Sequence, residues 1–139
     1  MAKEFMHKTL KELFPDYIVL IKIETFYEAY GDDANILSFL FSYKTRIIGE
    51  NISCGFPINS LNRIISILDR KSINYLVIDK SHNYEEEMKQ NYKRKNNYNE
   101  ILIDTNKYID KINKDLVYID NTRFFFLYFF LNSKINSVP

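Results

Sequence analysis

Few side chains in this sequence have the chemistry of a catalyst or a metal ligand. Cys54 is the only cysteine, and the two histidines, His7 and His82, lie far apart in the chain. A nucleophilic cysteine needs a base beside it, and a structural zinc ion needs four ligands. The favoured interpretation is therefore that Cys54 is a small buried residue at a strand end and that both histidines lie on the surface.

The acidic clusters and the glycines are equally poor candidates for an active site. Asp32-Asp33 directly precedes an apolar run, which favours a helix-capping role over a metal site or an acid–base pair. The triplet Glu85–Glu87 is typical of a solvated helix face. Neither the G-x-x-x-x-G-K-[ST] pattern nor G-x-G-x-x-G occurs, so no nucleotide-binding loop is indicated. We expect no enzyme activity, no cofactor and no metal.

The length and the net charge of the chain limit which classes of protein remain. The chain has 139 residues, 46% of them hydrophobic, with 19 Lys and Arg against 18 Asp and Glu. This length suits one domain, and a net charge of +1 argues against a strongly basic nucleic-acid binder. A single cysteine and a charged N-terminal segment without a secretory pattern predict a cytoplasmic protein.

The first eighty residues alternate between helical and strand patterns, which predicts an α/β fold with a sheet covered by helices. A turn is expected after the strand over Tyr17–Glu24. Phe56-Pro57 is expected to end the hairpin that begins at Thr45. The expected elements are a helix over Lys3–Phe14, a strand over Tyr17–Glu24, a helix over Asn35–Tyr43, a hairpin of Thr45–Ile48 and Asn51–Cys54, a helix capped by Ser60, and a strand over Tyr75–Asp79.

The composition changes after residue 80, which suggests three regions. We expect a core over residues 1–80, a polar and mainly helical extension over 81–121, and an aromatic tail over 122–139. Within the extension, Ile101–Leu116 has a helical stripe. The apolar run Phe124–Leu131 would cover only ~12 Å as a helix against a bilayer core of roughly 30 Å, so it cannot span a membrane alone. It is expected to pack on the domain or to mediate contact with a partner or a second copy.

The segment Thr25–Ala34 (TFYEAYGDDA) combines aromatic rings with carboxylates between the first strand and the apolar helix. The rings can belong to the core. They can also form a surface for base recognition, in which a ring wedges between stacked base pairs and a carboxylate accepts from a base edge. The residues alone favour the core and leave the second interpretation open.

Two blocks in register carry a family resemblance. FPDYIVLIKIETFYEAYGDDANIL is similar to the opening of the N-terminal mismatch-recognition domain (domain I) of MutS-type DNA mismatch repair proteins. Phe26-Tyr27-Glu28, Tyr30 and Asp33-Ala34 fall at the family's motif positions. Further along, CGFPINSLNRIISILDRKSINYLVIDK resembles the family's [CA]-G-[FV]-P followed by a helix and a strand. The resemblance covers Leu13–Lys80 and implies a mixed β-sheet flanked by helices, followed here by a helical C-terminal extension.

The resemblance also implies roles for two residues. At the position of Phe26 the family places the ring that stacks into the duplex from the minor groove, and at that of Glu28 the carboxylate that bonds the displaced base. A mismatched step is cheaper to unstack than a paired one. One departure is Glu24, which stands where the family has glycine and adds bulk and a repelling charge.

The chain is therefore interpreted as a stand-alone relative of MutS domain I that binds mismatched or bulged double-stranded DNA weakly, by wedge insertion and without ATPase activity. Proximity to the two blocks suggests the cations of Lys22, Lys44, Arg46 and Arg63 as phosphate contacts. The alternative is a protein-interaction module that keeps the fold and has lost DNA binding, which Glu24 and the near-neutral charge favour. Lesion preference, oligomeric state and biological pathway are left open by the sequence.

Overall fold

The computed structural model describes residues 2–79 and 95–115. His82, Glu85–Glu87 and the aromatic run Phe124–Leu131 lie outside the described residues. The chain forms two compact units, Met1–Thr105 and Asn106–Pro139. In the first unit Tyr98 belongs to the hydrophobic core, and Ile101 and Leu102 pack against it. Of the second unit, residues 106–115 are described and are helical.

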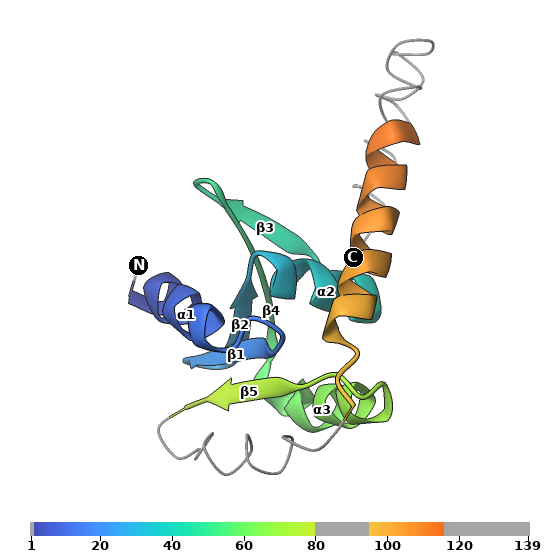
Figure 1. Cartoon of the computed structure of the whole chain (residues 1–139). Coiled ribbons are helices and arrows are strands. Elements are labelled where there is room, and N and C mark those ends of the chain that lie inside the picture. The colour runs from blue at the N-terminus through green and yellow to red at the C-terminus, as the bar shows by residue number, and fades with distance from the viewer. Residues whose placement is uncertain (1, 80–94, 116–139) are drawn as a thin grey trace. The chain divides into compact units, whose positions relative to one another are not determined.

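The core of the first unit is a five-stranded mixed sheet in the order β3-β4-β2-β1-β5 (Figure 1). β1 runs parallel to β5, and the other neighbours are antiparallel. The sheet is the α/β architecture that the sequence predicts. Its strands are β1 (Ile18–Ile23), β2 (Phe26–Tyr30), β3 (Thr45–Ile48), β4 (Asn51–Pro57) and β5 (Tyr75–Ile78).

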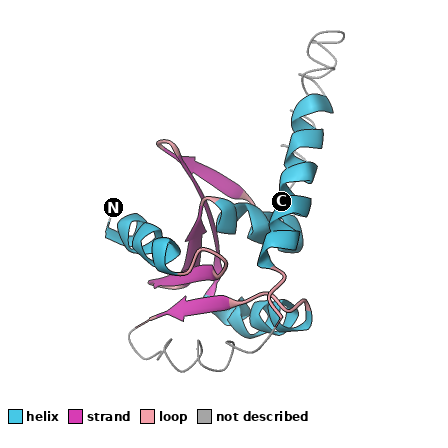
Figure 2. Ribbon diagram, in the orientation of Figure 1, coloured by secondary structure: helices cyan, strands magenta, loops and turns pink. Residues whose placement is uncertain are grey.

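Helices cover both faces of the sheet (Figure 2). On one face α1 (Ala2–Leu13) packs Leu10 against Val19, Ile21 and Leu76 of the strands. The other face carries α2 (Asp32–Phe41), the short 3-10 helix η1 (Ile58–Ser60) and α3 (Leu61–Arg70). Because successive strand residues alternate in direction, β1 contributes to both clusters and its side chains over Ile18–Ile21 are buried. A further helix spans residues 98–115, as the stripe over Ile101–Leu116 indicates.

Two predicted boundaries are wrong for identifiable reasons. The segment expected to be a turn after the first strand contains β2, because only Glu24 and Thr25 separate the paired residues Ile23 and Phe26. In the sequence, the charged Glu28 interrupts the apolar pattern that would otherwise indicate a strand. Likewise, β4 continues through Phe56-Pro57, since a proline is tolerated at the last position of a strand, where the sheet needs no further N–H donor.

Asp33 and His7 also differ from expectation. Asp33 lies inside the first turn of α2, whose N-cap is Gly31 without any side-chain cap, so Asp33 does not cap the helix. Its carboxylate is fully buried. His7 is buried too, not at the surface, because it faces that carboxylate at 3.1 Å. Ser60 does occupy the N-cap position of α3, but its side chain makes no capping hydrogen bond.

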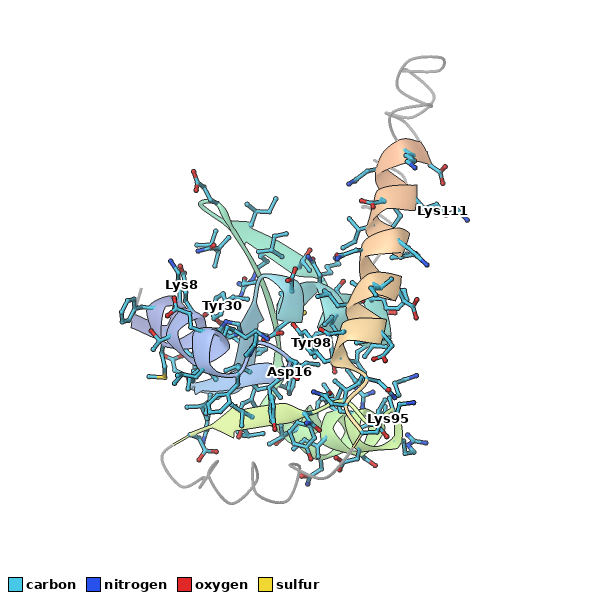
Figure 3. All side chains as sticks on the ribbon, viewed as in Figure 1. Lys8, Asp16, Tyr30, Lys95, Tyr98 and Lys111 are labelled. Carbon is cyan, nitrogen blue, oxygen red and sulfur yellow. The ribbon has the colours of Figure 1, made fainter. Side chains whose placement is uncertain are left out.

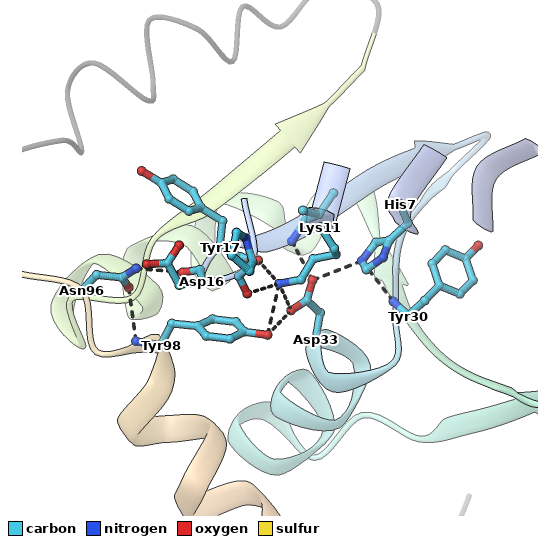
Figure 4. A network of polar contacts seen from close by, with 10 residues as sticks. His7, Lys11, Asp16, Tyr17, Tyr30, Asp33, Asn96 and Tyr98 are labelled. Carbon is cyan, nitrogen blue, oxygen red and sulfur yellow. Dashed lines mark hydrogen bonds and ion pairs between the residues drawn. The ribbon is translucent and has the colours of Figure 1, made fainter. Parts of the chain in front are cut away.

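The Asp33 carboxylate joins four segments of the chain (Figure 4). Its Oδ1 accepts from Lys11 Nζ at 3.0 Å and from the Tyr98 hydroxyl at 2.6 Å. Its Oδ2 accepts from the Val19 amide at 3.0 Å and faces His7 Nε2. Burial raises the pKa of the Tyr98 hydroxyl above its usual range, and the Asp33 charge raises it further. Tyr98 therefore stays a proton donor to Asp33 at neutral pH.

Asn96 and Asn97, just before the last helix, bind backbone groups beside the sheet and at the end of α3. Asn96 Nδ2 donates to the Asp16 carbonyl at 2.7 Å, and its Oδ1 accepts from the Asn74 amide at 3.1 Å. Asn97 Nδ2 donates to the Lys71 carbonyl at 2.9 Å. These bonds satisfy backbone groups that lie before β1, before β5 and at the C-terminus of α3. Within the described part of the chain, no helix is long and apolar enough to cross a membrane.

Replacing Asp33 with Asn tests how much this network contributes to the stability of the fold. A carboxamide has a single accepting oxygen, so its NH2 group would face two of the four donors that now surround Asp33. We expect Asp33→Asn to lower the free energy of unfolding by about 3 kcal/mol, as for other broken buried ion pairs. The measurement is urea denaturation followed by circular dichroism.

The adjacent Asp32 provides the matched control, because it is exposed and lies in the same helical turn. Asp32→Asn removes only a favourable charge near the helix N-terminus and should cost less than about 1 kcal/mol. Equal losses for the two variants would show that the buried network does not carry the stability assigned to it.

Candidate nucleic-acid interface

Phe26 and Glu28 lie on the same face of β2 because they are two residues apart in a strand. This is the face that α1 partly covers. In the strand register Phe26 lies between Ile23 and Pro57, and Glu28 lies between Ile21 and Gly55. The intervening Tyr27 points to the opposite face, where its ring stacks on that of Phe56 with the centroids 5.8 Å apart. The sheet thus presents the ring and the carboxylate together.

Phe26 is exposed although it belongs to a central strand. Its exposed fraction is 45%, whereas the next four residues of β2 are buried. The side chain adjoins the Glu24-Thr25 turn and belongs to neither buried cluster of the domain. An exposed phenyl ring at a sheet end is available to contact a flat apolar surface. This position meets the geometric requirement of a stacking wedge.

Glu28 is buried and already has partners. The Tyr30 hydroxyl donates to its Oε2 at 2.6 Å, and Lys3 Nζ lies 3.4 Å from the same oxygen. Burial and the nearby Glu28 charge raise the pKa of Tyr30 above its usual range, so the hydroxyl stays protonated. Near Oε1 the described residues place only Arg46 Nη2, at 3.7 Å. Oε1 is therefore the oxygen with the greater remaining capacity to accept a hydrogen bond.

Gly55 keeps the flank of this pair open. A Cβ atom built at Gly55 would lie 3.4 Å from Glu28 Cγ and 4.0 Å from Phe26 Cδ1. Any larger side chain would extend over both residues and over the path by which Arg46 reaches Glu28 across β4. Arg46 itself lies on the edge strand β3, paired with Ser53 of β4, and its side chain is largely exposed. It can therefore exchange Glu28 for another anion at low cost.

The structure brings together only part of the predicted phosphate-binding set. Of the four cations, Arg46 lies on the same sheet face as Phe26 and Glu28. Lys22 is paired with Tyr27 and therefore points to the opposite face, as does Arg63, which donates from α3 to the Tyr43 hydroxyl at 2.7 Å. Lys44 is exposed immediately before β3. The phosphate-binding role of all four cations remains a prediction.

Lys3 is a site residue that the sequence does not reveal. It lies far from Glu28 in the chain and reaches it only because α1 packs across the sheet. The candidate nucleophile Cys54 is in contrast excluded from chemistry at this surface. It is buried in the middle of β4, and burial raises the pKa of its thiol to about 11. Among the described residues no cluster of three potential metal ligands occurs.

The family comparison agrees with this geometry. The family model of MutS domain I matches residues 2–103. The chain belongs to the MutS domain I family. MutS domain I is a non-catalytic recognition domain, and the family points to DNA binding and mismatch recognition. A search of curated proteins found no match. The mixed sheet with flanking helices is the fold that this membership implies.

The structure gives two family positions a physical reason. Asp33 of the D-A pair is the buried centre of the network that joins α1, β1, α2 and Tyr98. Glu24, which replaces the family glycine, has a backbone φ of 56°. In that left-handed region a side chain costs roughly 1–2 kcal/mol and glycine does not. The departure at Glu24 therefore places strain and a negative charge beside Phe26.

Restoring glycine at position 24 should stabilise this MutS domain I protein. The relief of left-handed strain exceeds the added entropy of the unfolded chain, so Glu24→Gly is expected to raise the free energy of unfolding by about 0.5–1 kcal/mol. Glu50→Gly is the matched control, because Glu50 occupies the other two-residue hairpin turn without a positive φ. There the same substitution should destabilise by about 0.5 kcal/mol. Urea denaturation measures the change in the free energy of unfolding of each variant. A loss of stability in both variants would show that Glu24 is not strained.

Proposed function

We propose that this MutS domain I protein binds double-stranded DNA at mismatches or small bulges, with Phe26 as the stacking wedge and Glu28 as the acceptor for a base edge. The observation that carries the proposal is the exposure of Phe26 beside a buried, oriented carboxylate on one sheet face. Family membership supports the same function. Selectivity then comes from the low cost of unstacking a distorted step, with little sequence readout.

The charges around the site suggest how binding proceeds. Glu28 is neutralised in the free protein by Lys3 and Arg46. A DNA phosphate competes for the exposed Arg46 guanidinium through a bidentate, charge-assisted contact. That exchange leaves Glu28 Oε1 to accept a hydrogen bond from a base edge. The described residues place Lys3 and Arg46 at Glu28 beside the wedge, and the net charge of the chain is +1. We therefore expect weak binding that falls with salt.

We further propose that these residues act in the cytoplasm and do not hydrolyse ATP. The 139 residues contain no P-loop pattern. With magnesium present, DNA affinity should therefore be the same with ATP as with a non-hydrolysable ATP analogue. The second candidate function is a protein-interaction module. The negative Glu24 beside Phe26 favours it, because this charge repels phosphates while leaving an exposed ring for an apolar partner.

Fluorescence anisotropy tests the proposal on three labelled duplexes: one fully paired, one with a G·T mismatch and one with a single-base bulge. The wild type should prefer the two distorted duplexes. Phe26→Ala should weaken their binding about tenfold, because base–aromatic stacking contributes ~1–3 kcal/mol, and should remove the preference. Arg46→Ala should lower the slope of log affinity against log salt by about 0.9, the value for one phosphate.

Ile47→Ala is the matched control, since Ile47 is an exposed apolar residue of the same sheet on the face opposite Phe26. It should bind all three duplexes like the wild type. Binding that is absent at low salt, or indifferent to both distortion and Phe26, would reject DNA recognition in favour of the protein-interaction module.

A further inference from the structure

A groove of about 450 Å³ lies beside the proposed interface and takes no part in the wedge mechanism. It runs between α1, the junction of β2 with α2, and the first residue of β4. Figure 3 shows Lys8 on α1 and Tyr30 on β2, two of its lining residues, on the same side of the molecule. Tyr30 follows Glu28 by two residues on the same strand face. The groove therefore continues the row formed by Phe26 and Glu28.

The floor of the groove is aromatic and fixed. The rings of His7 and Tyr30 are both buried and meet edge to face, with centroids 5.2 Å apart and an interplanar angle of 78°. His7 Nε2 lies 3.1 Å from Asp33 and 3.4 Å from the Tyr30 amide. One nitrogen cannot both donate and accept, so the shorter contact with the charged carboxylate orients the ring. A floor held in this way needs no reorganisation when a ligand binds.

The walls supply an exposed ring and open space. Phe5 lines the groove with an exposed fraction of 72%, the largest of any aromatic side chain among the described residues. Gly31 also lines the groove and leaves an opening, since a Cβ atom built there would meet no atom within 4 Å. A flat aromatic ligand entering over Gly31 can stack against Phe5. Stacking of this kind is indifferent to base identity.

The polar groups at the rim select the type of ligand. The groove is lined by the acidic residues Glu4 and Asp32 and by Asn51, whose Nδ2 donates to Glu4 Oε2 at 3.3 Å. Two lysines also line it: Lys8 is exposed, whereas Lys11 is paired with the buried Asp33. Two carboxylates repel a phosphate from the interior and accept hydrogen bonds from N–H groups. A nucleobase is aromatic and uncharged and carries such donors, and Lys8 can pair with the phosphate attached to it. The lining therefore fits a base with its phosphate outside.

We propose that this groove receives the unpaired base of a bulged duplex, with Phe5 as its stacking partner. The proposal rests on the proposed DNA binding and adds a second site to it. The wedge and Glu28 act on the distorted step, and the groove holds the base that leaves the stack. An unpaired base costs less to extrude than a paired one. The groove thus favours bulges over mismatches, in which both bases keep a partner.

The test uses two duplexes of equal length, one with a single unpaired 2-aminopurine and one with a G·T mismatch. Phe5→Ala should weaken binding to the bulged duplex about tenfold and leave mismatch binding unchanged. Wild-type binding should also raise the 2-aminopurine fluorescence, because the extruded base leaves the neighbouring bases that quench it, and Phe5→Ala should abolish that rise. Leu13→Ala is the matched control on the same helix, with an exposed fraction of 67% outside the groove, and should behave like the wild type. Because Phe5 is exposed, the melting temperature of Phe5→Ala should equal that of the wild type.

Three results would overturn the assignment. The first is an equal effect of Phe5→Ala on both duplexes or no effect on either. The second is equal affinity for the unpaired 2-aminopurine strand alone. The third is displacement of the bulged duplex by a free deoxynucleoside monophosphate, because the natural ligand would then be a nucleotide. If Phe26 still governs binding in these cases, the groove assignment alone fails. If the wild type binds neither duplex, the proposed function fails with it.

Discussion

The fold depends on one buried negative charge. Asp33 has no exposure to solvent, and a carboxylate in such a place is tolerated only when donors surround it. Lys11 and His7 come from α1, the Val19 amide from β1, and the Tyr98 hydroxyl from the start of the last helix. Each of these segments must therefore be in place at once. The carboxylate makes the docking of α1, α2 and residue 98 mutually dependent.

The same constraint prepares the candidate interface. His7 and Lys11 anchor α1, and this placement brings Lys3 to Glu28 and sets His7 against Tyr30. Tyr30 in turn donates to Glu28. A continuous set of contacts thus leads from the buried centre to the carboxylate proposed to read a base. The reading group is oriented before DNA arrives, which lowers the ordering cost of a weak complex.

The exposed end of β2 combines features that oppose stability with features that suit recognition. Phe26 remains uncovered, and Glu24 holds a left-handed backbone conformation beside it. Gly55 contributes no side chain where one would cover the site. Strain and exposed apolar surface gathered at one place are characteristic of functional positions, because a core optimised for stability alone would bury the ring and relax the turn. In β1 and β5 the apolar side chains are buried or half-buried.

Local patterns in the sequence predict the α/β class and the main elements to within a few residues, and the motifs Phe26-Tyr27-Glu28 and CGFP indicate the family. These follow from local periodicity and from motifs that are contiguous in the chain. The sequence did not reveal β2 as a strand, because Glu28 interrupts the apolar alternation and is neutralised only by Lys3, Arg46 and Tyr30 in the folded chain. Nor did it reveal that Asp33 and His7 are buried together, or which cations share the face of Phe26. Those facts depend on contacts between segments distant in sequence, and only the packing of α1 and residue 98 across the sheet decides them.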